Sequence, residues 1–379
     1  MRVALHTPFV VHKHTGIARH IFGLLRGLAA TDTETEYVCF WDPQEPFPDW
    51  LPSNFRAEPF TIAGGNPVAR VLREQRWIEA AHRKHGFEAL HSPFGYLPPR
   101  PPCPSVVTVH DCRWLRYPRT FSLLRGVFLR WAIPRSVRQA RLTLTSSEAT
   151  RREVLEWIPG VQAERVRTVL LGLDPVWFEP PPAPSVERLR QQTGQEPFFL
   201  AVGTQEPHKN LPRLLEAYAL LRREIGEAHS LRLYLIGVQS FATGRHDDLG
   251  PVIARLGLQD RVRLLGATDD DLLRAAYHDA TALIFPSYYE GFGYPPLEAM
   301  AAGTPVVTSD ASCIPEIVGD AAELVDPFSA DSLAAGMARL LTDPARRSEL
   351  TTRGLAQARR YTWEDHARQM VHAYREATV

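Results

Sequence analysis

Short apolar runs alternate along this chain with amphipathic stretches of helical length. Several of the runs have continuous apolar centres, as do strands that helices cover on both faces. This alternation predicts an α/β protein whose parallel sheets are doubly wound by helices. The predicted strands are residues 2–6, 37–41, 88–92, 105–111, 142–146 and 167–172 in the first half, and 198–203, 231–237, 261–266, 282–287, 305–310 and 322–327 in the second.

A proline-rich stretch, EPPPAPSVE at 179–187, separates the two halves. Its prolines cannot continue a helix or a central strand, because they lack a backbone N–H. The stretch therefore predicts a junction between two domains. Doubly wound sheets bind ligands beyond the carboxyl ends of their strands, at the point where strand order reverses. The loops that follow strands are thus the places to expect functional residues.

Composition narrows the class of protein. The 379 residues are 44% hydrophobic, and 43 basic side chains balance 43 acidic ones. A neutral total argues against a nucleic-acid partner, which usually needs a basic domain. The N-terminal residues make a poor signal peptide, and no run approaches the ~20 apolar residues of a membrane span. The four cysteines form no CxxC pair, which favours reduced thiols in the cytoplasm over a disulfide frame or a zinc site.

The stretch EGFGYPPLE at 290–298 follows a predicted strand and precedes a short helix predicted at 296–302. Its two glycines let the backbone approach a ligand, and the start of a helix favours an anion. Two carboxylates, Glu290 and Glu298, flank this turn and would repel a phosphate. Taken alone, the stretch is equally well a plain strand-to-helix turn in which Glu298 complements the helix dipole.

A second stretch, FFLAVGTQEPHKN at 198–210, places Lys209 between a strand and a helix. An ammonium group in this position could neutralise a leaving diphosphate. The alternative is a solvated cation at a helix entry. The chain contains 40 arginines and only three lysines, so a lysine here favours the specific role.

Together these stretches resemble the retaining glycosyltransferases of the GT-B fold, specifically glycosyltransferase family 4 (group 1). The resemblance covers nearly the whole chain and is strongest in the C-terminal half. It also rests on HTGIARHIFGLLRGL (14–28), VVTVHDCRWLRYP (106–118), SCIPEIVGDAAELVDP (312–327) and YTWEDHARQMVHAY (361–374).

The resemblance implies two Rossmann-like doubly wound domains that face a central cleft. Residues 1–175, with the last helix at 361–379, would bind the acceptor, and residues 185–360 would bind the donor. The implied reaction moves a hexose, mannose or a related sugar, from a GDP- or UDP-linked donor to a glycan or lipid-linked acceptor with retention. The fold class generally works without a metal ion, and no other cofactor is expected.

The resemblance also assigns roles to individual residues. Glu290 would face hydroxyls of the transferred sugar and the charge that develops at its anomeric carbon, whereas Glu298 would take the ribose hydroxyls. Lys209 would be the cation of the diphosphate, and His110 would lie close to the transferred sugar. The remaining donor-binding residues would be Gly16, Gly203, Thr204, His208, Gly291, Phe292, Gly293, Tyr294 and Pro295.

Two departures from the family pattern concern the donor site. His208 stands where the family usually has arginine, so a permanent charge is replaced by a group with a reference pKa near ~6.5. We expect activity to fall as pH rises through the His208 titration, and we expect His208→Arg to flatten that profile. In the first domain, HTGIARH stands in place of the family's G-G-I-G-R-Y loop, with Thr15 for the first glycine and Ala18 for the third, which leaves Gly16 to approach the phosphates.

The segment from Arg113 to Arg141 holds eight arginines and no acidic residue. Arginines around apolar and aromatic side chains are typical of a surface that binds an anionic membrane. A packed helix with solvated arginine heads is the alternative. The membrane interpretation implies a cytoplasmic protein that binds peripherally to the inner face of the membrane.

Other functions remain compatible with these residues. A sugar-nucleotide-binding protein with weakened catalysis would explain His208 and the altered Gly16 loop, although intact Glu290, Glu298 and Lys209 oppose it. A GT-B phosphorylase or a sugar-nucleotide epimerase is a further enzymatic alternative. The two glutamates and the EPHKN segment favour transfer.

Overall fold

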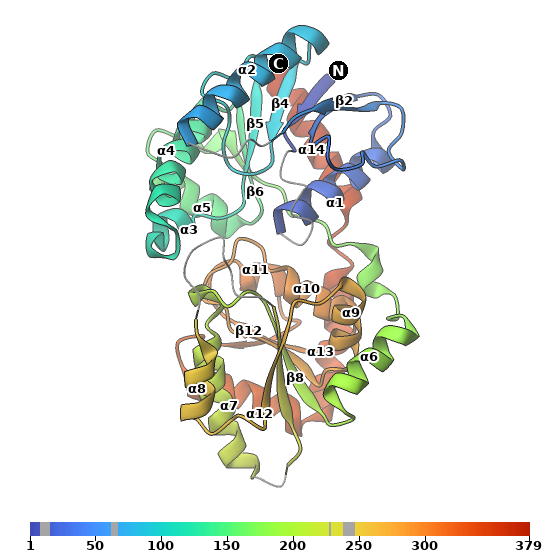
Figure 1. Cartoon of the computed structure of the whole chain (residues 1–379), viewed down its shortest axis with the longest axis vertical. Helices are drawn as coiled ribbons and strands as arrows, with labels where there is room; N and C mark the ends of the chain where they lie inside the picture. Colours follow the sequence, from blue (N-terminus) through green and yellow to red (C-terminus); the bar gives the residue numbers. More distant parts are fainter. Residues whose placement is uncertain (8–15, 62–66, 227–228, 238–246) are drawn as a thin grey trace. The chain divides into compact units, whose positions relative to one another are not determined.

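The computed structural model of this protein describes residues 1–7, 16–61, 67–226, 229–237 and 247–379. The chain forms two compact units, each built on a parallel sheet with helices packed on it (Figure 1). The first unit comprises Met1–Pro118, Leu123–Asp174 and Tyr361–Val379, and the second comprises Arg119–Ser122 and Pro175–Arg360.

The sheet of the first unit has the strand order β3-β2-β1-β4-β5-β6-β7 among the described residues. Neighbouring strands are parallel, with Val3 opposite both Tyr37 and Ala89. The central strands are buried on both faces, which explains their continuous apolar sequence. The strands are β1 (Arg2–Leu5), β2 (Glu36–Trp41), β3 (Phe55–Pro59), β4 (Ala89–Ser92), β5 (Ser105–Val109), β6 (Leu142–Thr145) and β7 (Val166–Thr168).

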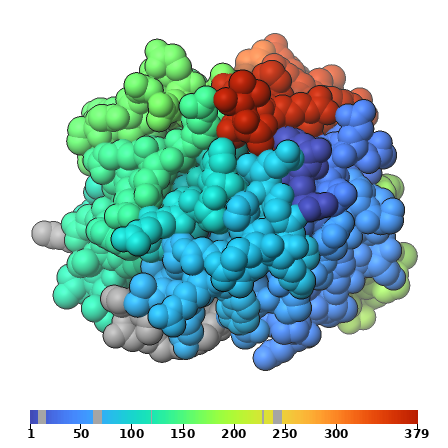
Figure 2. Space-filling model, turned by 90° about the horizontal axis from the view of Figure 1, so that it is seen from above, coloured from blue at the N-terminus to red at the C-terminus, as the bar shows by residue number. Residues whose placement is uncertain are grey.

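The helices of the first unit include the last helix of the chain, which packs beside the first (Figure 1). Figure 2 shows the C-terminal residues, in red, next to the N-terminal segment, in dark blue. The helices are α1 (Gly16–Thr31), α2 (Pro67–His85), α3 (Arg113–Arg116), α4 (Leu123–Gln139), α5 (Glu148–Trp157) and α14 (Trp363–Thr378).

Two glycines on α1 permit this close packing. A Cβ on Gly23 would lie 1.9 Å from the ring of Trp363, and one on Gly27 would lie 2.2 Å from the Trp363 carbonyl oxygen. On the other side of the indole, a Cβ on Gly172 would lie 2.5 Å from the Trp363 backbone nitrogen. The tryptophan at the start of α14 is therefore seated in a slot that only glycines leave open.

The sheet of the second unit has the order β10-β9-β8-β11-β12-β13 within the described residues. Its strands are β8 (Phe198–Val202), β9 (Arg232–Ile236), β10 (Val262–Gly266), β11 (Ala282–Phe285), β12 (Val306–Ser309) and β13 (Glu323–Val325). Its helices are α6 (Ala183–Thr193), α7 (Leu211–Ile225), α8 (Leu249–Arg255), α9 (Asp270–Asp279), α10 (Tyr294–Ala301), α11 (Ile314–Val318), α12 (Ala330–Thr342) and α13 (Pro344–Ala358).

The core of the second unit forms where α7 and α12 pack together over the sheet. Leu214, Leu221 and Met337 are fully buried there. Burying such side chains stabilises the fold by roughly 1.5–3 kcal/mol each. The chain order reverses between β8 and β11, so the loops after these two strands mark the place where a doubly wound sheet binds its ligand.

All the predicted strands are present, but the sequence pattern missed β3. Only Phe55 is buried in that edge strand, so it carries no apolar run. The expectation that the prolines at 179–187 exclude a helix was wrong for the second half of that stretch. Helix α6 begins at Ala183, because Pro182 and Pro184 occupy its first positions, where a missing N–H costs nothing.

Candidate functional site

Lys209 and Glu290 form an ion pair at the carboxyl ends of β8 and β11. The Lys209 Nζ lies 2.6 Å from Glu290 Oε1, and each side chain is only 14% exposed. Lys209 follows β8 at the end of a short 3₁₀ turn, η5 (Pro207–Lys209), and Glu290 lies in the loop after β11. The ammonium also stands 5.2 Å from the centre of the Phe285 ring. The structure thus brings together two residues that are 81 positions apart.

Two glycines leave the space that Lys209 and the backbone beside it occupy. Gly203 directly follows β8 and has φ +151°, and a Cβ there would lie 3.4 Å from Lys209 Cδ. Gly237 follows β9 with φ +146°, and a Cβ there would lie 1.8 Å from the Gly203 carbonyl oxygen. Sequence reasoning missed Gly237, although its position directly after a strand repeats that of Gly203.

The segment between Gly203 and the lysine is held by polar contacts. Thr204 Oγ1 donates a hydrogen bond of 3.0 Å to Glu206 Oε2, and His208 Nε2 lies 3.8 Å from the same oxygen. His208 is buried, and it forms an ion pair with Glu206 when protonated. The role of Glu206 was not predicted. The expected pH sensitivity of this site through His208 stays a prediction.

Asn210 ties the loop after β8 to its neighbours. It adopts the left-handed conformation, with φ +60°, between η5 and α7. Its side-chain amide donates to the carbonyl oxygens of Pro286 and Pro327, at 3.2 and 2.6 Å. The loop that carries Lys209 is therefore fixed to the loop that carries Glu290.

The turn before α10 is tightly packed. Gly293 is the N-cap with φ +100°, and a Cβ there would lie 2.7 Å from Ile314 Cδ1. Cys313 Sγ donates to the carbonyl oxygen of Phe292 at 3.2 Å, and Phe292 packs edge-on against Tyr294. Together these contacts fix the backbone from Gly291 onward.

Helix α10 begins at Tyr294, two residues earlier than predicted. Pro295 and Pro296 therefore lie in its first turn, and neither has an N–H. An anion at this helix start would be bound by the N–H groups of Tyr294 and of the residues before it.

The two flanking glutamates have different surroundings. Glu298 is 1% exposed and accepts a hydrogen bond of 2.9 Å from the Tyr277 hydroxyl on α9. Glu290 is held through its backbone by Ser312, which has φ +59°. The Ser312 hydroxyl accepts from the Glu290 N–H at 3.1 Å and donates to the Glu290 carbonyl oxygen at 2.7 Å. Sequence reasoning missed both Tyr277 and Ser312.

Two predicted site residues, His110 and Gly16, belong to the first unit. Gly16 is the exposed first residue of α1, and a Cβ added to it would meet nothing within 4 Å. The fold therefore does not require a glycine there. The preceding residue, Thr15, lies outside the described residues.

His110 follows β5 and is partly exposed. Its Nε2 lies 2.8 Å from the carbonyl oxygen of Pro93 and 3.2 Å from Nδ1 of His20. Burial lowers the pKa of His110, an effect that a bond to Pro93 and the charge of Asp111 oppose. The ring is therefore a neutral imidazole at neutral pH, suited to hydrogen bonding with a hydroxyl group.

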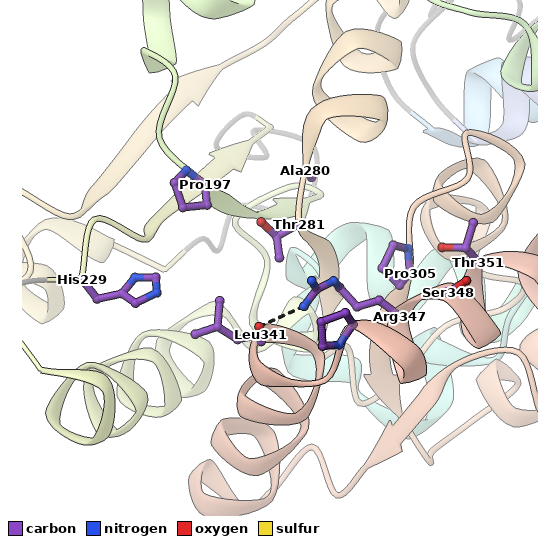
Figure 3. Close-up of a pocket in the computed structure, with 10 residues that line it drawn as sticks. Pro197, His229, Ala280, Thr281, Pro305, Leu341, Arg347, Ser348 and Thr351 are labelled. Atoms are coloured by element: carbon purple, nitrogen blue, oxygen red, sulfur yellow. Dashed lines mark hydrogen bonds between the residues drawn. The ribbon is translucent and has the colours of Figure 1, made fainter.

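A cavity of about 600 Å³ lies at the opposite end of the strands of the second sheet (Figure 3). Pro197, Thr281 and Pro305 line it and immediately precede β8, β11 and β12. In Figure 3 Arg347 reaches the carbonyl oxygen of Leu341, 2.9 Å away. The cavity is thus at the amino ends of the strands, away from Lys209 and Glu290, and its arginine stabilises the end of α12.

Two family models match this chain and together cover most of it. Residues 186–357 match the glycosyl transferases group 1, and residues 14–177 match glycosyltransferase family 4. The chain is 31% identical to O-antigen chain mannosyltransferase B of Escherichia coli, in an alignment that covers 99% of this chain and 100% of that protein. It is 32% identical to the MMP alpha-(1->4)-mannosyltransferase of Mycolicibacterium hassiacum, over 72% of this chain and 62% of that protein.

Solved structures share the fold. Sucrose-phosphate synthase from Thermosynechococcus elongatus aligns with a TM-score of 0.79 at 22% identity, over 99% of this chain and 98% of that one. Anabaena HepE, solved in complex with UDP-glucose, aligns with a TM-score of 0.74 at 20% identity, over 98% of this chain and 99% of that one. The chain therefore belongs to the group 1 glycosyltransferases of family 4 and is a glycosyltransferase of the GT-B fold.

Proposed function

We propose that this glycosyltransferase moves a mannosyl residue from a nucleotide diphosphate to a hydroxyl group of a glycan or lipid-linked acceptor, with retention at the anomeric carbon. The observation that carries the proposal is the 2.6 Å ion pair of Lys209 and Glu290 at the point where strand order reverses. The choice of mannose rests on the two mannosyltransferases to which the chain is similar.

In the proposed reaction the bond from the anomeric carbon to the diphosphate oxygen breaks. A bond from the same carbon to the acceptor oxygen forms on the same face, and the acceptor proton passes to the departing diphosphate. Lys209 would stabilise the negative charge of that leaving group. One of its three N–H donors is used by Glu290, so two others remain available for phosphate oxygens. In this scheme the positive charge that stabilises the leaving diphosphate comes from the protein, and no metal ion takes part.

The two glutamates would flank the diphosphate without repelling it. Lys209, which pairs with Glu290, would separate that carboxylate from the phosphates. The carboxylate would accept hydrogen bonds from the transferred sugar and favour positive charge at its anomeric carbon. Glu298, held by Tyr277, would accept bonds from the ribose hydroxyls. His110 would contact a hydroxyl of the transferred sugar. The second unit is thus proposed to bind the donor, and the first the acceptor.

A panel of sugar nucleotides tests the donor assignment. GDP-mannose, UDP-glucose, GDP and UDP would be compared by thermal shift, and we expect GDP-mannose to raise the melting temperature most. Hydrolysis of the donor without acceptor then separates an enzyme from a pure binding protein, which should release no sugar. NMR of the transferred anomeric proton tests retention. A free sugar phosphate or an epimerised sugar nucleotide as product would instead support a phosphorylase or an epimerase.

The acceptor would be met at an anionic membrane surface, to which we assign α4. Leu123, Leu124, Val127 and Trp131 are 78%, 77%, 55% and 50% exposed. At 100° per residue they fall within an arc of about 100° on the helix. Arg135 stacks on Trp131, with its guanidinium carbon 5.6 Å from the ring centre. No helix in the described part of the chain is long and apolar enough to cross a membrane.

Exposed leucines and a tryptophan among arginines fit a helix that lies in the membrane interface. Co-sedimentation with vesicles that contain phosphatidylglycerol tests this assignment at low and high salt. Trp131→Ser should reduce the bound fraction several-fold. Trp157→Ser is the matched control, because Trp157 is 41% exposed on α5. Absence of binding by the wild-type chain at low salt would remove the membrane from the proposal.

A further inference from the structure

Three histidines from distant parts of the sequence form a continuous chain in the first unit. His110 Nε2 lies 3.2 Å from His20 Nδ1 on α1, and His20 Nε2 lies 3.2 Å from His366 Nε2 on α14. His20 and His366 are 0% and 2% exposed, whereas His110 is partly exposed. The chain therefore runs from a candidate substrate-contacting residue into the core of the unit.

Backbone carbonyl groups close both ends of this chain. His110 Nε2 lies 2.8 Å from the carbonyl oxygen of Pro93, and His366 Nδ1 lies 2.8 Å from that of Leu170. A carbonyl oxygen only accepts hydrogen bonds, so each of these ring nitrogens must carry a proton. A neutral imidazole has one N–H, so the other ring nitrogen of His366 is an acceptor.

These two anchors determine the position of every proton between them. Because His366 Nε2 is an acceptor, His20 must donate to it through Nε2–H. His20 Nδ1 then carries a lone pair, which accepts from His110 Nε2–H. All contacts are satisfied by one arrangement of neutral rings, in which the single Nε2–H of His110 is shared between the Pro93 carbonyl oxygen and His20 Nδ1. In it His110 and His20 are protonated at Nε2 and His366 at Nδ1.

We propose that His20 and His366 are positioning residues that, together with the Pro93 carbonyl oxygen, hold the Nε2–H of His110 toward the core and leave Nδ1 as the hydrogen-bond acceptor presented to substrate. This inference rests on the proposed function in one respect, because only that function identifies the group that donates to Nδ1 as a sugar hydroxyl. The arrangement of the protons does not depend on that function.

The chain holds a tautomer and does not conduct protons. A proton that entered at His110 could pass no further than His366, whose Nδ1–H ends on the Leu170 carbonyl oxygen. Burial lowers the pKa of His366 to about 4, and burial with the neighbouring histidines lowers that of His20 well below its usual value. Both rings thus stay neutral at neutral pH, as the single arrangement requires.

The ring nitrogens can be observed directly in the full chain labelled with ¹⁵N-histidine. Long-range ¹H–¹⁵N correlation distinguishes the two neutral tautomers, and single substitutions assign the signals. We expect Nε2–H for His20 and His110, and Nδ1–H for His366. A wild-type spectrum in which His110 is protonated at Nδ1 overturns the proposal, whatever the activity.

His366→Phe then tests whether the chain acts on His110. Phenylalanine keeps an aromatic ring but removes both nitrogens, so His20 loses its acceptor and its Nδ1 can carry the proton instead. His110 Nε2–H then keeps only the Pro93 carbonyl oxygen as its acceptor, and we expect the His110 ¹⁵N signals to shift because the contact with His20 is lost. Turnover should fall about 5- to 10-fold with the KM for the donor nearly unchanged. His366→Gln, which retains a donor and an acceptor, should restore part of the loss and of the His110 signal.

His372→Phe is the matched control on the same helix, because the His372 side chain is 76% exposed. It should change neither the His110 signal nor turnover. Unchanged His110 signals in His366→Phe would reduce His20 and His366 to packing residues. Should that variant not fold, His366→Leu, which also lacks both ring nitrogens, decides in its place. The expected tautomers together with no transfer from any sugar nucleotide would refute the proposed function and leave the histidine chain standing.

Discussion

The two units hold their candidate functional groups by different physical means. In the second unit, Lys209 and Glu290 come from two loops after neighbouring strands and stabilise each other by opposite charge. In the first unit, His110 is uncharged and is held by hydrogen bonds that lead to α1 and α14. An ion pair at the surface of a sheet can open toward a charged ligand, whereas a neutral chain anchored on carbonyl groups keeps one geometry. Under the proposed function, the donor site would rearrange on binding and the sugar contact would not.

The largest effect should follow removal of the ion pair. Lys209→Ala and Glu290→Ala should each reduce transfer at least ~100-fold, because in the proposed reaction each removes a charge that acts in the transition state. Initial rates with saturating donor and acceptor measure the effect. Near-normal rates in both variants would refute the site.

Lys84→Ala provides the control for this test. Lys84 is 62% exposed and pairs with Glu58 in the first unit. Exposed pairs contribute little to stability, and transfer should stay within about twofold of wild type. A large loss in Lys84→Ala would mean that any missing lysine, and not the donor site, explains the result.

The docking of α14 should be the next most sensitive feature. Replacing glycine by alanine in a helix usually stabilises it by roughly 0.5–1 kcal/mol. At Gly27 the added Cβ would instead lie 2.2 Å from the Trp363 carbonyl oxygen, so Gly27→Ala should lower the free energy of unfolding by about 1–3 kcal/mol. Urea denaturation measures the change.

Gly16→Ala is the matched control on the same helix, because a Cβ there meets nothing within 4 Å. It should leave stability unchanged or slightly higher. The same variant tests whether Gly16 approaches the donor phosphates, since weaker donor binding without loss of stability would be due to the ligand alone. Equal destabilisation by both variants would contradict the packing argument.

Sequence alone predicted the second unit better than the first. Glu290 and Lys209 lie in short stretches with glycines and prolines that have a direct chemical meaning. The residues that support the two glutamates were harder to find, because Ser312 and Tyr277 act through hydrogen bonds to residues 22 and 21 positions away. Nothing local in the sequence marks such a contact.

The histidine chain could not have been predicted from the sequence. His20 and His366 are 346 positions apart and lie on amphipathic helices, where a buried histidine is indistinguishable from any other core residue. Only the return of α14 to the first unit brings them together. The edge strand β3 was missed for a related reason, because it buries a single residue at one end.

The buried histidines should make stability fall in mild acid. Burial lowers the pKa of His91 to about 3 and that of His366 to about 4, and the pKa of His20 is also lowered. In the unfolded chain these groups titrate near ~6.5. Below that pH the unfolded state binds protons that the native state refuses, so the free energy of unfolding should fall by ~1.4 kcal/mol per pH unit for each histidine.

Urea denaturation at pH 7, 6 and 5 measures this slope. The window lies above the range in which carboxylates titrate, so the histidines dominate it. His366→Phe should reduce the slope by about one histidine, whereas His372→Gln, at an exposed position, should leave it unchanged. A stability that does not vary between pH 7 and 5 would contradict neutral burial.

The smallest expected effect concerns the hydrogen bond from Tyr277 to Glu298. Tyr277→Phe removes one donor from a carboxylate that is 1% exposed, and such a bond contributes on the order of 1 kcal/mol. If Glu298 binds the ribose, the KM for the donor should rise about fivefold with turnover unchanged, because the bond acts equally in the ground and transition states.

Tyr218→Phe is the control, since Tyr218 is a buried tyrosine on α7 of the same unit. Its hydroxyl donates a hydrogen bond of 2.7 Å to the Leu231 carbonyl oxygen. This variant should lower the free energy of unfolding by about 1 kcal/mol without changing the KM for the donor. A fall in turnover with unchanged KM in Tyr277→Phe would instead place Glu298 among the groups that act only in the transition state. Both glutamates of the second unit would then act in the chemical step. The contrast with the first unit, whose sugar contact His110 is uncharged, would be sharper still.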